Sequence, residues 1–472
     1  MDLSLLTTEI VTVALACFVV ALDLLMPAGE PRRALGYLTL LGLAGIFVHA
    51  FTQYGLNASL YGGMFRVDDY AVFFKQVFLA AYMLTILFSV RTADGFAPYT
   101  GEFYGLMLFS LAGMMVMASA NDLVTLFVGM ELMTITFFVL VGFNLGDGKS
   151  SEAGVKYLIL GAASTAVLLY GMSLIYGYTG TVVLPEIAAR LSASPAALVG
   201  IVFFLAGFAF KIAAVPFGMW VPDVYEGAPV PITALLAMAS KAASFAVLTR
   251  VFLTAFADAP YNWPLIIAWL AAASMIAGNL AAILQTNVKR LLAYSSIAQA
   301  GYLLTGLVAA GPDGVKGIIF YTALYVFASA GAFAVVAAVR DETGSDDIAA
   351  YRGLARSSPL LAAAMTVALL SMAGIPPLAG FVGKLYLFLA VLEKGWFWLA
   401  LLGFVMSMVS VYYYLLVVKA MYLGEPAGAP TADGCAALRW AALASLALTV
   451  LCGVYPTPLA ALASRVAQNF FQ

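Results

Sequence analysis

The chain consists of long apolar runs separated by short polar connections. Fourteen runs approach or exceed the roughly 20 residues that a helix needs to cross a membrane. They lie at approximately 4–26, 35–54, 70–90, 102–119, 122–144, 152–177, 196–217, 229–256, 262–283, 291–310, 315–339, 358–392, 396–422 and 436–456. This pattern predicts an all-α polytopic membrane protein with about 14 transmembrane helices and no sizeable inserted soluble domain.

Two of these runs contain prolines that should break the helix. Pro216 lies five residues after Lys211 in one run, and Pro376 and Pro377 interrupt the run 358–392, which is too long for one straight span. Proline removes a backbone N–H and clashes with the preceding turn. The sequence therefore predicts two proline-broken helices, each carrying a lysine.

The broken helices also indicate an internal repeat. Helices four to eight and nine to thirteen form two sets of five, and the broken helix is the fourth member of each set. A repeat with an odd number of helices enters the membrane from opposite sides, which gives the inverted topology common in transporters. The predicted units are an N-terminal three-helix segment (1–100), repeat 1 (101–257), repeat 2 (258–424) and a C-terminal helix (425–472).

Composition supports the membrane assignment and excludes several kinds of function. Of the 472 residues, 64% are hydrophobic and 10% are charged, whereas soluble domains contain about 25% charged residues. The net charge of −2 and the lack of a basic cluster argue against a nucleic-acid partner. His49 is the single histidine, and the three cysteines show no C-x-x-C spacing, so metal and haem sites are not expected.

The basic residues of the connections predict an orientation, because cytoplasmic loops carry more Lys and Arg. With the N-terminus outside, the inner connections and flanks hold Arg32, Arg33, Arg91, Lys149, Lys289, Arg290, Arg340, Arg352, Arg356, Lys419 and Arg439. The outer ones hold Arg66, Arg190, Lys316, Lys394 and Arg465. Both termini are therefore expected on the outer face, with the connection 340–357 inside.

Four charged residues lie deep in the apolar runs: Lys211, Lys241, Lys384 and Glu131. An ammonium at the bilayer centre costs about 2.5–3.5 kcal/mol on insertion scales, so such a lysine normally faces a bundle interior or a water-filled cavity. Glu131 lies roughly 13 Å along its helix and is the only acid placed so centrally. These groups either transfer protons or form static pairs and interface anchors; their occurrence together in broken and consecutive helices favours proton transfer.

Two further lysines lie nearer the ends of their helices. Lys156 lies one turn into its helix, and by itself this position favours a side chain that extends to the membrane interface. Lys289 precedes Arg290 at a helix start, where both could anchor the inner side. A row of lysines bridged by water and polar side chains could relay protons, and the bridging residues expected from the sequence are Ser240, Ser244, Tyr225 and Tyr412.

Several motifs resemble one known family. The stretches FVGMELMTI, FKIAAVPFGMWVPDVYEGAP, NVKRLLAYSSIAQAGYLL, FYTALYVFASAGAF and MAGIPPLAGFVGKLYLF are similar to the subunit N family of proton-pumping NADH–quinone oxidoreductase, respiratory complex I. The resemblance covers most of the chain. It differs at Gly218, where the family often has histidine. Tyr321 and Tyr325 stand where the two sister antiporter-like subunits carry His and Lys, which favours subunit N.

The resemblance implies a role for each deep residue. Glu131 and Lys211 would be the interacting pair of the first half-channel, Lys241 the connecting lysine, and Lys384 the exit-side lysine of the second half. The further lysines that match the family are Lys156 and Lys289.

The resemblance also implies a setting for the chain. It would be a proton-translocating subunit of the oxidoreductase, without redox cofactors of its own, and flavin and iron–sulfur clusters would belong to partner subunits. A sister antiporter-like subunit would lie beside it in the bacterial cytoplasmic membrane, with both termini periplasmic. The alternatives are a cation/proton antiporter subunit of a separate multi-subunit transporter and a structural scaffold whose proton path has decayed.

Overall fold

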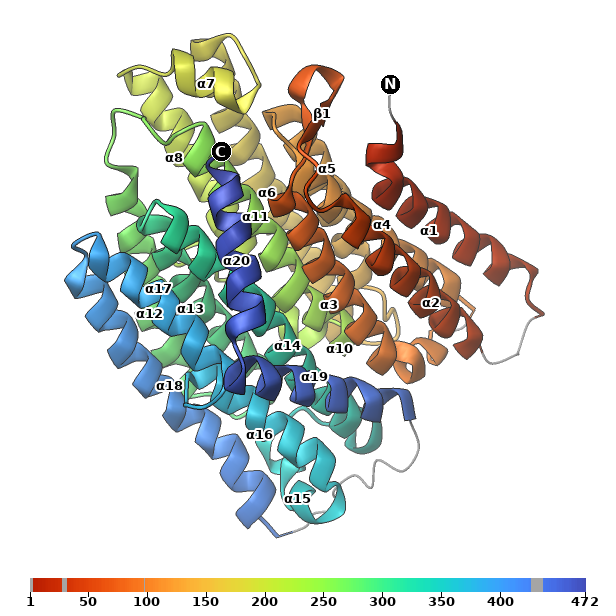
Figure 1. Cartoon of the computed structure of the whole chain (residues 1–472). Coiled ribbons are helices and arrows are strands. Elements are labelled where there is room, and N and C mark those ends of the chain that lie inside the picture. The colour runs from red at the N-terminus through yellow and green to blue at the C-terminus, as the bar shows by residue number, and fades with distance from the viewer. Residues whose placement is uncertain (1–2, 28–31, 97, 426–435) are drawn as a thin grey trace.

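The computed structural model describes residues 3–27, 32–96, 98–425 and 436–472, and helices dominate it (Figure 1). Thirteen helical segments within these residues are long and apolar enough to cross a membrane, and Pro359–Ala373 is a shorter apolar helix that belongs to a fourteenth element. The spanning elements are α1 (Thr7–Leu25), α2 (Arg33–Ala50), α3 (Asp69–Asp94), α4 (Thr100–Ser119), α5 (Leu123–Val141), α6 (Gly148–Thr179), α8 (Pro195–Ile212), α10 (Val230–Leu235) with α11 (Lys241–Thr254), α12 (Trp263–Ile283), α13 (Val288–Val308), α14 (Pro312–Thr343), α16 (Pro359–Ala373) with α17 (Ala379–Glu393), α18 (Phe397–Leu423) and α19 (Ala436–Val454).

The fourteen predicted runs all correspond to these elements, with boundaries that differ by a few residues. The run 358–392 is α16 and α17, two halves of 15 residues each, separated at Gly374. The other broken helix ends earlier than expected: α8 stops at Ile212, and Ala213 takes a left-handed conformation with φ 64°. A turn then leads into α9 (Val221–Gly227).

The short elements were not predicted from the apolar pattern. They are η1 (Leu3–Leu6), η2 (Phe51–Gln53), β1 (Ala58–Leu60), η3 (Tyr61–Gly63), β2 (Phe65–Val67), α7 (Leu184–Arg190), η4 (Leu236–Ser240), η5 (Ile348–Tyr351), α15 (Leu354–Ser357) and α20 (Thr457–Phe470). Strands β1 and β2 form an antiparallel hairpin in which Ser59 pairs with Arg66. Element η4 is a π-helical turn between α10 and α11.

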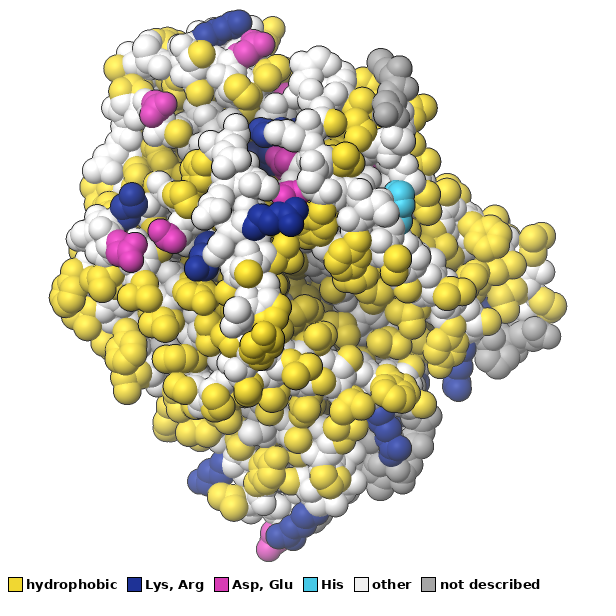
Figure 2. Space-filling view, viewed as in Figure 1, with side chains coloured by type: hydrophobic (Ala, Val, Ile, Leu, Met, Phe, Trp, Pro, Cys, Tyr) yellow, Lys and Arg dark blue, Asp and Glu magenta, His cyan; other side chains and the backbone are white. Residues whose placement is uncertain are grey.

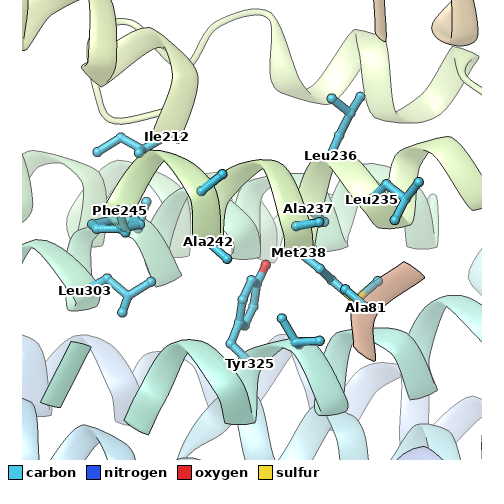
Figure 3. Close-up of a cluster of buried hydrophobic side chains, with 14 of the residues drawn as sticks. Ala81, Ile212, Leu235, Leu236, Ala237, Met238, Ala242, Phe245, Leu303 and Tyr325 are labelled. Atoms are coloured by element: carbon cyan, nitrogen blue, oxygen red, sulfur yellow. The ribbon is translucent and has the colours of Figure 1, made fainter. Parts of the chain in front are cut away.

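Helices that are apolar on all sides occupy the centre of the bundle, as expected for fully buried helices. Every residue of the most apolar stretch of Val230–Thr254 is buried, against only 28% to 33% in α1, α2, α6, α18 and α19 at the periphery. Figure 3 shows Met238 and Phe245 of this central segment near Tyr325 of α14 and Leu303 of α13. The segment that carries Lys241 is thus the central element of the molecule.

The C-terminal region holds two helices rather than the single helix expected for 425–472, of which 426–435 lie outside the described residues. Helix α20 begins after Pro456, is amphipathic and packs back onto α3 and α14. Its Asn469 donates a 2.8 Å hydrogen bond to Asp69, and its Phe470 ring lies 4.8 Å from that of Tyr70. Polar residues that interrupt the apolar pattern of this segment therefore bind it to α3.

The bundle has two polar ends and an apolar middle. In Figure 1 both chain ends lie at the end that carries β1 and α7, while α15 lies at the opposite end. Figure 2 shows hydrophobic side chains over much of the middle of this face, with Lys, Arg, Asp and Glu gathered toward the two ends. This is the surface expected of a protein whose middle lies in lipid.

Candidate functional site

The first group of deep residues lies between α5, α6 and α8. The Lys211 Nζ donates a 2.8 Å hydrogen bond to Thr134 Oγ1 on α5, and Lys211 is only 3% exposed. Glu131 lies three residues before Thr134, on the same face of α5. Its carboxylate accepts a 3.0 Å hydrogen bond from Thr165 on α6. Within the described residues these two groups are neighbours through α5 but do not form a direct ion pair.

Among the described residues six other acids are more completely buried than Glu131, but they lie at helix ends or in connections: Glu9, Asp23, Asp68, Asp69, Asp122 and Asp346. Glu9 pairs with the buried Lys75 at 2.6 Å, and Asp23 pairs with Arg32 at 3.0 Å. Glu9 is in the first turn of α1 and Asp23 in its last. Glu131 therefore remains the acid nearest the middle of a spanning helix.

Lys241 is the second deep lysine and follows the π-helical turn η4 directly. It is 2% exposed, and its Nζ donates to both the carbonyl and the hydroxyl oxygen of Ser296 on α13. π-bulges inside α-helices occur frequently at functional sites. Here the bulge ends at the residue before the lysine, in the most buried segment of the chain.

A chain of polar side chains continues from Ser296 toward the second broken helix. The neighbouring Ser295 is hydrogen-bonded to the hydroxyl of Tyr414 on α18. Gln299, one turn further along α13, donates to Tyr414 at 3.5 Å and to the Met372 carbonyl at 3.1 Å, and accepts from Tyr321 of α14. These bonds connect α13, α14 and α18 to the C-terminal end of α16.

Lys384 completes this chain at the break between α16 and α17. Its Nζ donates to the Ala373 carbonyl at 3.1 Å and to Ser407 Oγ at 2.8 Å, and lies 4.1 Å from the centre of the Tyr302 ring. Ala373 is the last residue of α16, where a helix leaves carbonyl groups without intrahelical partners. The break thus supplies an acceptor for the ammonium, next to the Met372 carbonyl that binds Gln299.

Lys156 lies outside this buried row. It forms ion pairs with Glu152 at 2.7 Å and with Asp223 of α9 at 2.8 Å, and its side chain is 43% exposed. Arg290 also pairs with Asp223, and with Glu226, at 2.9 Å each. The hydrogen bond from Lys156 lowers the pKa of the Asp223 carboxyl below its usual range. A cavity of about 110 Å³ opens among these residues.

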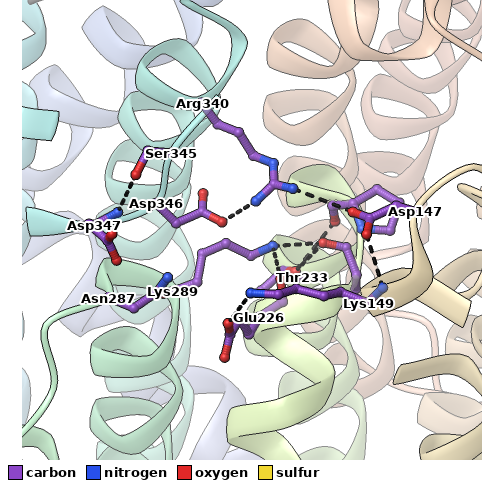
Figure 4. A network of polar contacts seen from close by, with 12 residues as sticks. Asp147, Lys149, Glu226, Thr233, Asn287, Lys289, Arg340, Ser345, Asp346 and Asp347 are labelled. Carbon is purple, nitrogen blue, oxygen red and sulfur yellow. Dashed lines mark hydrogen bonds and ion pairs between the residues drawn. The ribbon is translucent and has the colours of Figure 1, made fainter. Parts of the chain in front are cut away.

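Lys289 lies beside Glu226 of the same cluster (Figure 4). It is fully buried, and its Nζ donates to the backbone carbonyls of Glu226 at 2.8 Å and Ala228 at 2.7 Å. Nearby, Arg340 of α14 binds Asp346 and lies 3.7 Å from Asp147. The structure thus groups Lys156 and Lys289 with α9 at one end of the bundle and leaves Lys211, Lys241 and Lys384 in its interior.

The structure corrects one expected bridging residue and adds others. Tyr412 is 58% exposed, whereas Tyr413 and Tyr414 are buried. Tyr225 does reach Ser296, at 3.4 Å, and Ser244 donates to the backbone of Ser240 rather than to a lysine. The polar residues that the sequence analysis missed are Thr134, Thr165, Asp223, Glu226, Asn279, Ser295, Ser296, Gln299 and Tyr414. A polar stripe at positions 295, 296, 299 and 302 of an apolar helix was the available signal.

The presence of glycine at position 218 also has a structural reason. A Cβ atom there would lie 2.4 Å from the Ala213 carbonyl oxygen, so the first break is too tight for a side chain without a shift of the backbone. Among the described residues no group of three or more His, Cys, Asp and Glu side chains could hold a metal ion. The functional groups gathered here are therefore amines, carboxylates, hydroxyls and amides.

Comparison with known proteins identifies the class to which this fold belongs. Residues 120–410 match the family described as NADH:quinone oxidoreductase/Mrp antiporter, TM. The fold is similar to a chain of respiratory complex I from Thermus thermophilus with bound Aureothin, with a TM-score of 0.83, 34% identity and coverage of 97% of this chain and 99% of that one. It is also similar in fold to a chain of the Mrp complex from Dietzia, with a TM-score of 0.88. Fold and site together define an antiporter-like membrane subunit.

Relatives that match over their whole length identify the family within this class. NADH-quinone oxidoreductase subunit N of Heliobacterium modesticaldum is 55% identical over 472 residues, which is 100% of both chains. The protein of the same name from Moorella thermoacetica is 51% identical over 100% of this chain and 99% of its own. The chain belongs to the NADH-quinone oxidoreductase subunit N family.

Proposed function

We propose that the chain translocates protons across the membrane as a subunit of an NADH–quinone oxidoreductase. The observation that supports this best is the set of buried hydrogen bonds between the two lysines. Lys241 donates to Ser296, the adjacent Ser295 and Gln299 bind Tyr414, and Gln299 and Lys384 donate to the adjacent carbonyls of Met372 and Ala373. Ionisable residues inside membrane helices are expensive and typically belong to ion or proton pathways. Two amines joined by hydroxyl and amide groups can exchange protons in small steps.

Each expected residue takes a role in this proposal. Glu131, which accepts from Thr165, and Lys211, which donates to Thr134, exchange a proton in the first half. Lys241 passes it into the polar chain, and Lys384 releases it from the second half. Lys156 and Lys289, in the ionic cluster around α9, set the electric field at one end of the path.

The two halves of this path would correspond to repeat 1 (101–257) and repeat 2 (258–424). The support is that each contains one helix broken at a proline-containing turn, followed by a long helix. The segment 1–100 and the C-terminal helices then pack beside the repeats.

The chemistry that drives transport would lie in other subunits. Flavin and iron–sulfur clusters in partner subunits would oxidise NADH, and a conformational or electrostatic change would reach this chain through a sister antiporter-like subunit. The exposed apolar stripe of α5 (Val124, Val128, Ile135 and Val139) offers such a neighbour a hydrophobic contact surface.

Replacement of the connecting lysine tests the proposal. Lys241→Met removes the charge but keeps the side-chain length, so we expect an assembled complex whose rate of coupled proton translocation falls about a hundredfold, the lower end of what one proton-transfer group contributes. Lys394→Met is the matched control because Lys394 is exposed, at the end of α17. Normal pumping by an assembled Lys241→Met complex would refute the relay.

The alternative, a cation/proton antiporter, is favoured by the fold shared with the Mrp complex chain. The two functions differ in what the isolated chain can do. Purified chain in liposomes that exchanges Na⁺ for protons without NADH or quinone would support the antiporter, whereas an inactive isolated chain with an active complex would support the oxidoreductase subunit.

We also infer that both termini are periplasmic and that the connection 340–357 is cytoplasmic, because the basic residues favour that orientation. A cysteine at Ser345, within this connection, should react with an impermeant maleimide only in inverted membrane vesicles. A cysteine at Asn57, in the connection before β1, should react only in right-side-out vesicles. The reverse pattern would invert the topology.

A further inference from the structure

A large cavity that the proton path does not use lies at the end of the bundle that carries α15. Its volume is about 810 Å³, and it opens between the C-terminal ends of α12 and α18 and the connection that contains η5. Four charged side chains line it: Arg352, Lys419, Asp347 and Glu425. The volume lies within the range of sites for small organic ligands.

These four charges differ from those of the ionic cluster around α9 at the same end of the molecule. Lys149, Arg290 and Arg340 all form ion pairs with carboxylates. In the part of the chain that the structure describes, none of the four charged side chains in the cavity forms an ion pair. Two cations and two anions thus face one cavity without neutralising each other.

The aliphatic stem of Arg352 packs against the end of α18. A Cβ at Gly424 would lie 2.8 Å from Arg352 Cγ, so the glycine leaves the space in which this stem packs. The next residue, Gly353, donates a 3.3 Å hydrogen bond to the Ala420 carbonyl of α18. The connection is therefore tied to the end of α18 at the point where Arg352 enters the cavity.

The remaining wall is apolar and faces outward. Leu284, just after α12, is 81% exposed, and Leu423, the last residue of α18, is 76% exposed. Both residues lie at the ends of spanning helices, so the cavity lies where the membrane interior meets the aqueous phase. An amphiphile fits this boundary: charges at the helix ends and hydrocarbon along the helices.

We propose that this cavity binds the headgroup of an aminophospholipid such as phosphatidylethanolamine. Arg352 and Lys419 bind the phosphate, Asp347 and Glu425 accept hydrogen bonds from the primary ammonium, and the acyl chains follow Leu284 and Leu423. Basic pockets at the ends of membrane helices bind phospholipid headgroups. A purely anionic headgroup would be repelled by both carboxylates. The trimethylated ammonium of phosphatidylcholine has no N–H to donate to them.

The test uses the intact, detergent-purified complex and photoactivatable lipids with phosphatidylethanolamine, phosphatidylglycerol or phosphatidylcholine headgroups. Labelled peptides are identified by mass spectrometry. We expect phosphatidylethanolamine to label the peptides around 284, 352 and 419 several-fold more than the other two lipids. The labelling measurement does not depend on proton translocation, so its result is separate from the test of the proposed function.

Charge removal separates this site from general lipid contact. Arg352→Gln with Lys419→Gln should lower phosphatidylethanolamine labelling of these peptides about 25-fold, because each basic side chain near a membrane surface contributes roughly a fivefold change in affinity. Arg356→Gln is the matched control, since Arg356 is exposed on the same connection but does not line the cavity. Asp347→Asn with Glu425→Gln should abolish the preference for phosphatidylethanolamine over phosphatidylglycerol.

Three results would overturn the proposal. Equal labelling by all three lipids would leave only a hydrophobic contact, and unchanged labelling in the Arg352→Gln, Lys419→Gln complex would exclude the phosphate contacts. Efficient cross-linking of a Lys419→Cys complex to another subunit would show that a protein segment fills the cavity.

Discussion

The two broken helices look alike in sequence but hold their lysines in different ways. Lys211 lies in the last turn before its break and donates to Thr134, three residues from Glu131. Lys384 lies after its break and donates back across it to the Ala373 carbonyl. The two lysines are therefore not equivalent by position, although each lies beside a turn with a cis X–Pro bond.

The difference is electrostatic. The first lysine donates to Thr134, which lies one helical turn from the Glu131 carboxylate on α5, so an ionisable acid lies near this lysine. The second is held by a carbonyl, a hydroxyl and the Tyr302 ring, which favour a cation without being ionised themselves. In the proposed path the first half can switch by proton exchange, whereas the second half depends on the geometry of the break.

The largest expected effect concerns that geometry. A Cβ at Gly380 would lie 1.8 Å from the Ser371 carbonyl oxygen, closer than the 2.4 Å found at Gly218 in the first break. Gly380→Ala should therefore destabilise the chain by about 3 kcal/mol and Gly218→Ala by about 1–2 kcal/mol, as overpacking does. The fraction of intact complex after graded heating measures both. Gly45→Ala, where nothing lies within 4 Å, is the control, and equal losses at 380 and 218 would refute the ranking.

The next effect concerns the two lysines themselves. Lys211→Met and Lys384→Met should each reduce the rate of coupled proton translocation about a hundredfold in an assembled complex, because each removes one proton carrier. The rate of NADH-driven proton uptake by proteoliposomes measures this, with Lys394→Met as the exposed control. If Lys384→Met instead prevents assembly while Lys211→Met does not, Lys384 holds the break together and is structural.

The smallest effect should come from the carboxylate of the first half. Glu131→Gln keeps the hydrogen bond from Thr165 but loses the charge, so translocation should fall about threefold, by loss of part of one proton-transfer step. Combined with Lys211→Met it should cause no additional loss, as expected for two members of one unit, whereas with Lys384→Met the losses should multiply. Glu393→Gln, at the exposed end of α17, serves as control. If the losses caused by Glu131→Gln and Lys211→Met multiply in the double variant, the two residues act independently.

Much of the fold was predictable because membrane insertion depends on local composition. Fourteen apolar runs, two proline breaks and the deep positions of Lys211, Lys241 and Lys384 were all evident along the chain, and the structure confirms their burial. Helix α20 was not predicted. Its alternating polar residues weaken the apolar signal, and its partner Asp69 lies nearly 400 residues away.

The sequence by itself determined which segments span the membrane. A helix of about 20 consecutive apolar residues makes all its backbone hydrogen bonds internally and is stable in lipid whatever surrounds it. It also determined which residues carry charge at depth. Only the tertiary structure decided which side chains meet. Tyr412, Tyr413 and Tyr414 are identical residues in one run, but successive positions on a helix point about 100° apart, so packing of α18 against α13 and α12 exposes the first and buries the other two. Helix rotation is a property of the assembled bundle, and for that reason the polar chain from Lys241 to Lys384 becomes evident only in the folded protein.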